Sequence, residues 1–162
     1  MNKDVTIVGA GLVGTLVSIY LAKKGYNVTI YERRNDMRKV KMSAGKSINL
    51  ALSDRGWKGL QGVGIADEIK KIAIPMYGRY IHNKDGSNAY QPYGKDEQAI
   101  YSVSRAEINM KLMDLAEQQP NVKIHFDSNW KILEEGFVVG EGERRQFFEG
   151  WDSESVDLLL LL

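Results

Sequence analysis

The sequence predicts a mixed α/β fold, in which a β-α-β unit comes first and an antiparallel element interrupts the layer that it begins. A β-branched run, a glycine-rich turn, an apolar helix and a second strand follow one another within residues 5–32. Strand-like runs around an Asp-Gly turn then occupy residues 74–103. A helix and a strand within residues 104–126 return to the first pattern.

Length and composition fit one globular domain, or a part of a larger one. The 162 residues are 43% apolar and 27% charged, with a formal net charge of +1, a balance that favours neither nucleic acid nor an anionic membrane as a partner. The chain has no cysteine, which excludes disulfides, cysteine metal ligands and thiol nucleophiles. His82 and His125 do not have the spacing of a metal site. The lack of cysteine agrees with a cytoplasmic location, which we expect.

The uncharged stretch 5–22 has the length of a membrane span or a signal-peptide core. Three glycines interrupt it near its start, and Asp4 does not suit the basic leader of a signal peptide. A strand at 5–8, a glycine turn and a helix at 12–24 explain the stretch better. We therefore expect no membrane segment in this part of the chain.

Stop signals and turn residues place the elements that follow. Gly25, just after two lysines, predicts the end of the first helix, and a strand is expected at 28–32. The polar, basic residues 33–46 predict a solvated loop before a short strand at 48–52. Ser53 predicts the N-cap of a helix through about residue 71, although four glycines within it weaken that prediction.

The second half of the chain contains a hairpin and a capped helix. Asp85-Gly86 follows a strand-like run and is typical of a hairpin turn, and another strand is expected at 99–103. Ser104 and Glu107 have the spacing of a capping box. The helix they open has an apolar face and ends at Pro120, before a strand at 122–126. Beyond residue 127 the pattern weakens, with a possible hairpin at 130–150.

A G-x-G-x-x-G sequence, formed by Gly9, Gly11 and Gly14, carries the clearest functional signal. It follows a strand and opens a helix, and Glu32 ends the next strand at about the distance expected of the acid that binds a ribose. The glycines allow a tight turn, close approach of a pyrophosphate, and close helix–strand packing. The fingerprint leaves FAD and NAD(P) open as the ligand. Arg33 and Arg34 suggest a 2′-phosphate, whereas the Glu32 carboxylate would repel one.

Several blocks outside the fingerprint make the sequence similar to a known family. They are GKSINLALSDRG (45–56), IPMYGRYIH (74–82), QPYGKD (91–96), YSVSR (101–105) and NVKIHF (121–126). In order and spacing they resemble the kynurenine 3-monooxygenases, which are FAD-dependent aromatic hydroxylases. Lys46 stands where that family usually has arginine, a departure that retains the charge.

The resemblance implies a function and a set of site residues. It implies a Rossmann-like FAD-binding fold that carries the start of an antiparallel substrate-domain sheet, with 3-hydroxylation of L-kynurenine in tryptophan catabolism by bound FAD, the co-substrate NADPH and oxygen. Arg79 and Tyr93 match the pair that holds the substrate carboxylate. The positions expected to bind the cofactor, from the fingerprint and the resemblance together, are Gly9, Gly11, Val13, Gly14, Tyr31, Glu32, Arg33, Arg34, Ala51 and Arg105. No side chain of this chain is expected to be catalytic or to bind metal, since the flavin performs the hard chemistry.

The resemblance also predicts how the chain is organised. Residues 1–73 are expected to form the FAD-binding β-α-β segment, 74–103 a substrate-side insertion, and 104–162 a return to the FAD-binding domain. The blocks end near residue 126, so the chain is expected to be the N-terminal third of such an enzyme and inactive alone. Two alternatives remain open at this point: an NADP-dependent reductase and a non-catalytic nucleotide-binding fragment.

Overall fold

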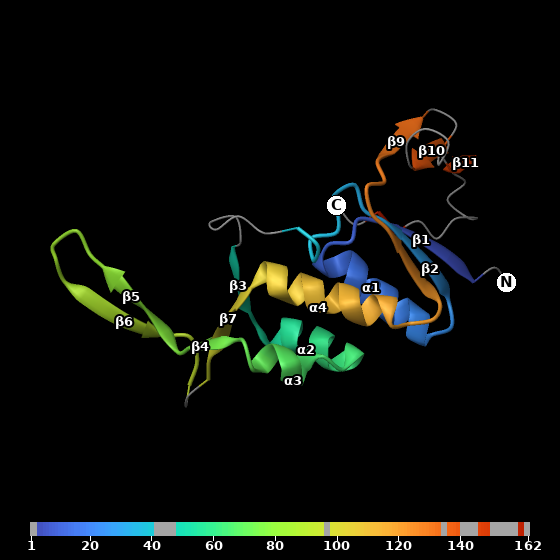
Figure 1. The fold of residues 1–162 in the computed structure, drawn as a ribbon. Helices are drawn as coiled ribbons and strands as arrows, with labels where there is room; N and C mark the ends of the chain where they lie inside the picture. The colour runs from blue at the N-terminus through green and yellow to red at the C-terminus, as the bar shows by residue number, and fades with distance from the viewer. Residues whose placement is uncertain are drawn as a thin grey trace. The chain divides into compact units, whose positions relative to one another are not determined.

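The computed structural model describes residues 3–40, 48–95, 98–133, 136–139, 146–149 and 159–160 (Figure 1). The chain divides into two compact units, one formed by residues 1–44 with 109–162 and the other by residues 45–108. The predicted α/β class is confirmed. These units divide the chain at other positions than the functional segments expected from the sequence, which stay a prediction.

The first unit is built on a parallel sheet. Its four strands are β1 (Asp4–Val8), β2 (Asn27–Tyr31), β8 (Val122–His125) and β12 (Leu159–Leu160). They lie in the order β12-β1-β2-β8, and every neighbouring pair is parallel. The side chains of Ile7 and Ile30 are fully buried, as expected of a sheet with the β-branched runs seen here. The predicted strand-turn-helix-strand opening is therefore confirmed.

Helix α1 (Leu12–Lys23) joins β1 to β2. Gly14, Ser18 and Ala22 are among its buried residues, so small side chains form much of its packed face. Gly25 has a φ of +83° and its amide donates to the carbonyl of Ala22 at 2.9 Å, which ends the helix as the sequence predicted. The Asn121 side-chain amide donates to the carbonyls of Ala22 and Tyr26 at the same end.

The second unit contains an antiparallel sheet of β3 (Asn49–Leu52), β7 (Ile100–Ser104) and β4 (Ile74–Met76), in that order. The prediction of a single helix over residues 53–71 is wrong. The segment is divided into α2 (Asp54–Val63) and α3 (Ala66–Lys70), because Gly64 has a left-handed φ of +86° and ends the first of them. Ser53 is the N-cap residue of α2, but its side chain makes no capping hydrogen bond.

A two-stranded ribbon and a helix complete the predicted pattern. The strands β5 (Gly78–His82) and β6 (Asn88–Pro92) form an antiparallel hairpin, and Gly86 in its turn has a φ of +84°. Helix α4 (Arg105–Glu117) begins where the capping box predicts, and the Glu107 amide donates to the Ser104 hydroxyl at 3.3 Å. Ile108, Leu112 and Ala116 on its expected apolar face are buried.

After β8 the first unit also contains a small antiparallel sheet. Its strands are β9 (Trp130–Leu133), β10 (Gly136–Val139) and β11 (Gln146–Glu149), in the order β11-β10-β9. Three strands therefore lie where the sequence suggested a hairpin. Within the described ranges, no helix has the length and apolar character needed to cross a membrane. Lys46, the departure from the family pattern, lies outside the described residues.

Candidate functional site

The three glycines of the fingerprint have different surroundings in the turn between β1 and α1. Gly9 has a φ of +100°, and its amide donates to the Tyr31 carbonyl at 2.8 Å. A Cβ on Gly14 would collide with the Gly9 carbonyl oxygen and lie 3.3 Å from the Ile7 Cγ2 atom. A Cβ on Gly11 would meet nothing within 4 Å. The turn is thus closed on the side of Gly14 and open on the side of Gly11.

The open side of this turn lies at the N-terminus of α1, where Gly11 is the N-cap residue. No side chain caps this end, and the first turn contains no acidic residue. The amides of Leu12, Val13 and Gly14 have no carbonyl partner within the helix, and the helix dipole adds partial positive charge. Val13 is 54% exposed beside them. Such an end attracts an anion, and the pyrophosphate of a dinucleotide has the chemistry to occupy it.

Glu32 lies just beyond the end of β2 and is only 4% exposed. Its Oε2 accepts from the Ala10 amide at 2.9 Å, and its Oε1 accepts from the amide and the Nε of Arg34 at 3.0 and 2.8 Å. Burial opposes ionisation, but the hydrogen bonds from Arg34 and Ala10 and the charge of Arg34 outweigh it, so the pKa of Glu32 is lowered. Oε2 also accepts from the NH2 nitrogen of Arg34 at 3.4 Å, so a further donor would reach this oxygen by displacing that long bond.

The residues next to Glu32 differ in exposure. The Tyr31 ring is stacked on His125 with 5.2 Å between centroids, and burial raises the pKa of Tyr31. Arg33 is exposed, and the Arg34 side chain is 68% exposed although its Nε binds Glu32. The predicted cofactor contacts of Tyr31, Arg33 and Arg34 stay predictions.

The side chain of Arg38 is largely shielded from solvent, whereas the sequence predicted a solvated loop over residues 33–46. Its side chain is 18% exposed, and its Nε and NH2 nitrogens donate to the two carboxylate oxygens of the buried Asp36 at 2.8 and 2.9 Å. Its NH1 nitrogen donates to Asp114 and Glu117 of α4, each at 2.8 Å. The hydrogen bonds and charge of Arg38 lower the pKa of Asp36, and the bonds to Asp114 and Glu117 tie the segment after β2 to α4. The sequence offered one signal for this, an acid two residues before an arginine.

Ala51 and Arg105, the other predicted FAD contacts, belong to the second unit. Ala51 is exposed on β3, opposite Ser102 of β7. Arg105 is exposed at the start of α4, and its backbone amide donates to the Ile48 carbonyl at 3.1 Å. Both roles stay predictions.

The predicted substrate residues lie on or next to the β5–β6 ribbon. The guanidinium of Arg79 donates to the Oε1 of Gln91, its neighbour across the ribbon, at 2.9 and 2.7 Å. The Tyr93 amide donates to the Tyr77 carbonyl at 2.9 Å, which extends the pairing past β6. Residues two apart point to one face of a strand, so the backbone pattern places Arg79 and Tyr93 on the same face. Arg79 thus binds the oxygen of a neutral side-chain amide.

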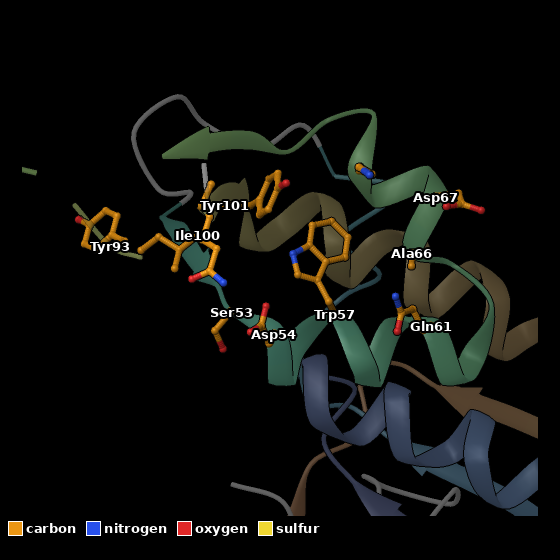
Figure 2. Close-up of a pocket in the computed structure, with 12 residues that line it drawn as sticks. Ser53, Asp54, Trp57, Gln61, Ala66, Asp67, Tyr93, Ile100 and Tyr101 are labelled. Carbon is orange, nitrogen blue, oxygen red and sulfur yellow. The ribbon is translucent and has the colours of Figure 1, made fainter. Parts of the chain in front are cut away.

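A pocket of about 520 Å³ lies in the second unit, and no sequence pattern predicted it (Figure 2). Residues of α2, α3 and β7 line it, together with Tyr93. Trp57 packs edge-on against Tyr101, and its indole nitrogen has no hydrogen-bond partner among the described residues. Arg79 does not line the pocket. Over the part of the chain that the structure describes, no group of histidine and acidic residues has the arrangement of a metal site.

Comparison with known proteins agrees with this geometry. The chain is 43% identical over 160 residues to the kynurenine 3-monooxygenase of Christiangramia forsetii, covering 98% of this chain and 35% of that protein. It is 53% identical over 127 residues to the kynurenine 3-monooxygenase of Myxococcus xanthus, covering 77% of this chain and 27% of that protein. The chain thus spans about a third of the length of these relatives.

Solved structures of similar fold and one protein-family model also match most of this chain. The p-nitrophenol 4-monooxygenase of Pseudomonas putida DLL-E4 superposes with a TM-score of 0.69 at 18% identity, covering 88% of this chain and 38% of that one. A 2-methyl-3-hydroxypyridine-5-carboxylic acid oxygenase gives a TM-score of 0.69 at 17% identity, covering 93% and 38%. At these identities the likeness concerns the fold. Residues 2–146 match the family described as the FAD binding domain, and the chain belongs to that family.

Proposed function

We propose that this chain is the FAD-binding portion of a flavin-dependent monooxygenase that hydroxylates L-kynurenine at ring position 3, with NADPH and oxygen as co-substrates. The turn of residues 9–14 is the observation that carries the FAD part, because it presents free amides beside an open space and a buried acid. The 40–53% identity to kynurenine 3-monooxygenases over most of the chain supports the substrate. A cytoplasmic location belongs to the same proposal.

The residues present fit an FAD pyrophosphate and ribose. Gly11 leaves room for the pyrophosphate, and the amides that open α1 can donate to its oxygens. Glu32 can accept from a ribose hydroxyl through its Oε2, where the hydroxyl would displace the long bond from the exposed Arg34 side chain. When bound, the flavin supplies the redox chemistry, and the chain binds and orients it.

Arg79 and Tyr93 are proposed to hold the kynurenine carboxylate. A guanidinium can donate two parallel hydrogen bonds to a carboxylate, and a phenol hydroxyl can add a third. A charged carboxylate competes well with the neutral Gln91 amide that Arg79 now binds, since charge-assisted hydrogen bonds are the stronger ones. This contact would give specificity for an amino-acid substrate.

Absorbance of the purified 162-residue chain tests the FAD part. We expect a bound yellow chromophore, and we expect Glu32→Ala to weaken FAD binding by about 1–3 kcal/mol, the scale of hydrogen bonds to a charged group. Glu68→Ala, a change of the same kind on α3, should leave FAD affinity unchanged. A chain that takes up NADP but no flavin would instead support a reductase.

A chimera tests the substrate part. Residues 1–126 of this chain would be joined to the remainder of the kynurenine 3-monooxygenase of Flavobacterium johnsoniae, which is 42% identical to it. Arg79→Lys should raise the KM for kynurenine at least tenfold while FAD stays bound, because a lysine cannot form the two-bond contact. Tyr93→Phe should weaken kynurenine binding by about 0.5–3 kcal/mol, because it removes one hydrogen bond. The KM for a decarboxylated analogue of kynurenine should hardly change on Arg79→Lys. If the chimera and its Arg79→Lys variant bind kynurenine equally well, Arg79 does not hold the substrate carboxylate.

A further inference from the structure

We propose that Asn109 is a positioning residue for the FAD pyrophosphate: its side-chain amide fixes the Ala10 carbonyl so that the Gly11 amide faces the ligand. The inference rests on the proposed binding of FAD. Neither the fingerprint nor the family resemblance pointed to Asn109, which lies 99 residues along the chain from Ala10.

Ala10 is held from both sides by tertiary hydrogen bonds. Its amide donates to the Glu32 Oε2 at 2.9 Å, and its carbonyl accepts from the Asn109 Nδ2 at 3.1 Å. Ala10 itself is fully buried, so both bonds are shielded from water. The two peptide groups that Ala10 shares with its neighbours are therefore both fixed in orientation.

The orientation of these peptide groups decides which atoms face the ligand. In a trans peptide the C=O and the following N–H point in opposite directions. Because Asn109 holds the Ala10 C=O toward α4, the Gly11 N–H points away from α4. That N–H has no partner among the described residues, and the space beside Gly11 is open. The bond from Asn109 thus sets the direction of a donor that a pyrophosphate oxygen can use.

The surroundings of Asn109 make a purely structural role a poor explanation for it. The residue is only 6% exposed, and within the described part of the chain its Oδ1 has no hydrogen-bond partner. An apolar side chain would remove this unpartnered acceptor but would leave the buried Ala10 carbonyl without its donor, so the asparagine adds little net stability. The second contact of its Nδ2 is to the Met37 sulfur at 3.3 Å, a weak acceptor. The Ala10 carbonyl is therefore the main acceptor of the Asn109 side-chain amide.

The test is to measure thermal stability and FAD affinity of the 162-residue chain after Asn109→Leu. Leucine has the same number of side-chain heavy atoms in the same branched arrangement, and it removes both the donor and the unpartnered acceptor. We expect the Kd for FAD, followed by quenching of flavin fluorescence, to rise about tenfold while the Tm without FAD changes little, because the loss of the unpartnered Oδ1 offsets the Ala10 carbonyl left without a donor. The Kd for ADP, measured by competition, should rise by a similar factor because ADP contains the same pyrophosphate.

Asn121→Leu is the matched control, because Asn121 also donates from its side-chain amide to backbone carbonyls, but at the other end of α1. It should lower the Tm and leave the Kd for FAD unchanged. If Asn109→Leu does not fold, Asn109→Met removes the same donor with a side chain that adapts more easily to its surroundings.

Three outcomes separate the inference from the proposed function. A fall in Tm with an unchanged Kd would show that Asn109 is structural and overturn the inference. An unchanged Kd and Tm would also overturn it, while leaving FAD binding intact. Absence of FAD binding by the unchanged chain would refute the proposed function, and the inference with it.

Discussion

Replacement of Gly14 by alanine tests the packing of the fingerprint turn. The Cβ atom that alanine adds would overlap the Gly9 carbonyl oxygen and press on Gly9 C and Ile7 Cγ2, both at 3.3 Å. The carbonyl belongs to the backbone and cannot rotate away as a side-chain end can. Helix α1 would therefore have to move away from the turn, which would disturb both the fold and the pyrophosphate site.

The size of the effect follows from two opposing contributions. Overpacking costs about 1–3 kcal/mol, and the upper end applies because the obstructing atom is backbone. Alanine is favoured over glycine inside a helix by about 1 kcal/mol, and Gly14 is inside α1. We therefore expect Gly14→Ala to lower the free energy of unfolding by about 2 kcal/mol.

Urea unfolding of the chain without FAD, followed by circular dichroism, measures this change as a shift of the midpoint with the slope unchanged. Gly11→Ala is the matched control, because its Cβ meets nothing within 4 Å and its φ of −76° suits alanine. It should change the free energy of unfolding by less than about 0.5 kcal/mol, since a poorer N-cap is offset by a less flexible unfolded chain. Yet it should weaken FAD binding. If Gly14→Ala is as stable as the unchanged chain, Gly14 does not pack closely against the Gly9 carbonyl.

Two further predictions concern the charged groups beside this turn. The pKa of Glu32 is below its ordinary value of 4.5, so its ionised form stabilises the fold above about pH 4.5 and this contribution is lost as the pH falls further. The stability of the unchanged chain relative to Glu32→Gln should therefore decline between about pH 5 and 3 in urea titrations, and a constant difference would contradict it. Arg38→Met should cost about 3 kcal/mol because it leaves the buried Asp36 carboxylate without its main partner, at the lower end for such pairs because Lys39 remains 3.7 Å away. Asp114→Asn, at an exposed partner of the same arginine, should cost less than about 1 kcal/mol.

Local patterns in the sequence determined the α/β class and the main elements of the first unit. The β-branched run before the glycines, the stop at Gly25 and the capping box at Ser104 each act within a few residues, so they can be read without the fold. The Asp85-Gly86 turn was equally local, and the hairpin that it predicted is present. The expected helix over residues 53–71 was wrong in one respect, because the sequence does not show which of its four glycines takes the left-handed conformation.

Contacts between distant segments were decided by the tertiary structure alone. The sequence marked Glu32 as a ribose ligand but not as the acceptor of the Ala10 amide, 22 residues away. It placed Arg38 in a solvated loop, whereas the fold brings Asp114 and Glu117 to it from α4. It gave no role to Asn109, because an asparagine within a helical pattern looks the same whether it faces water or a buried carbonyl. A short motif specifies its own backbone, but the partners of a side chain depend on which segments the whole chain brings together.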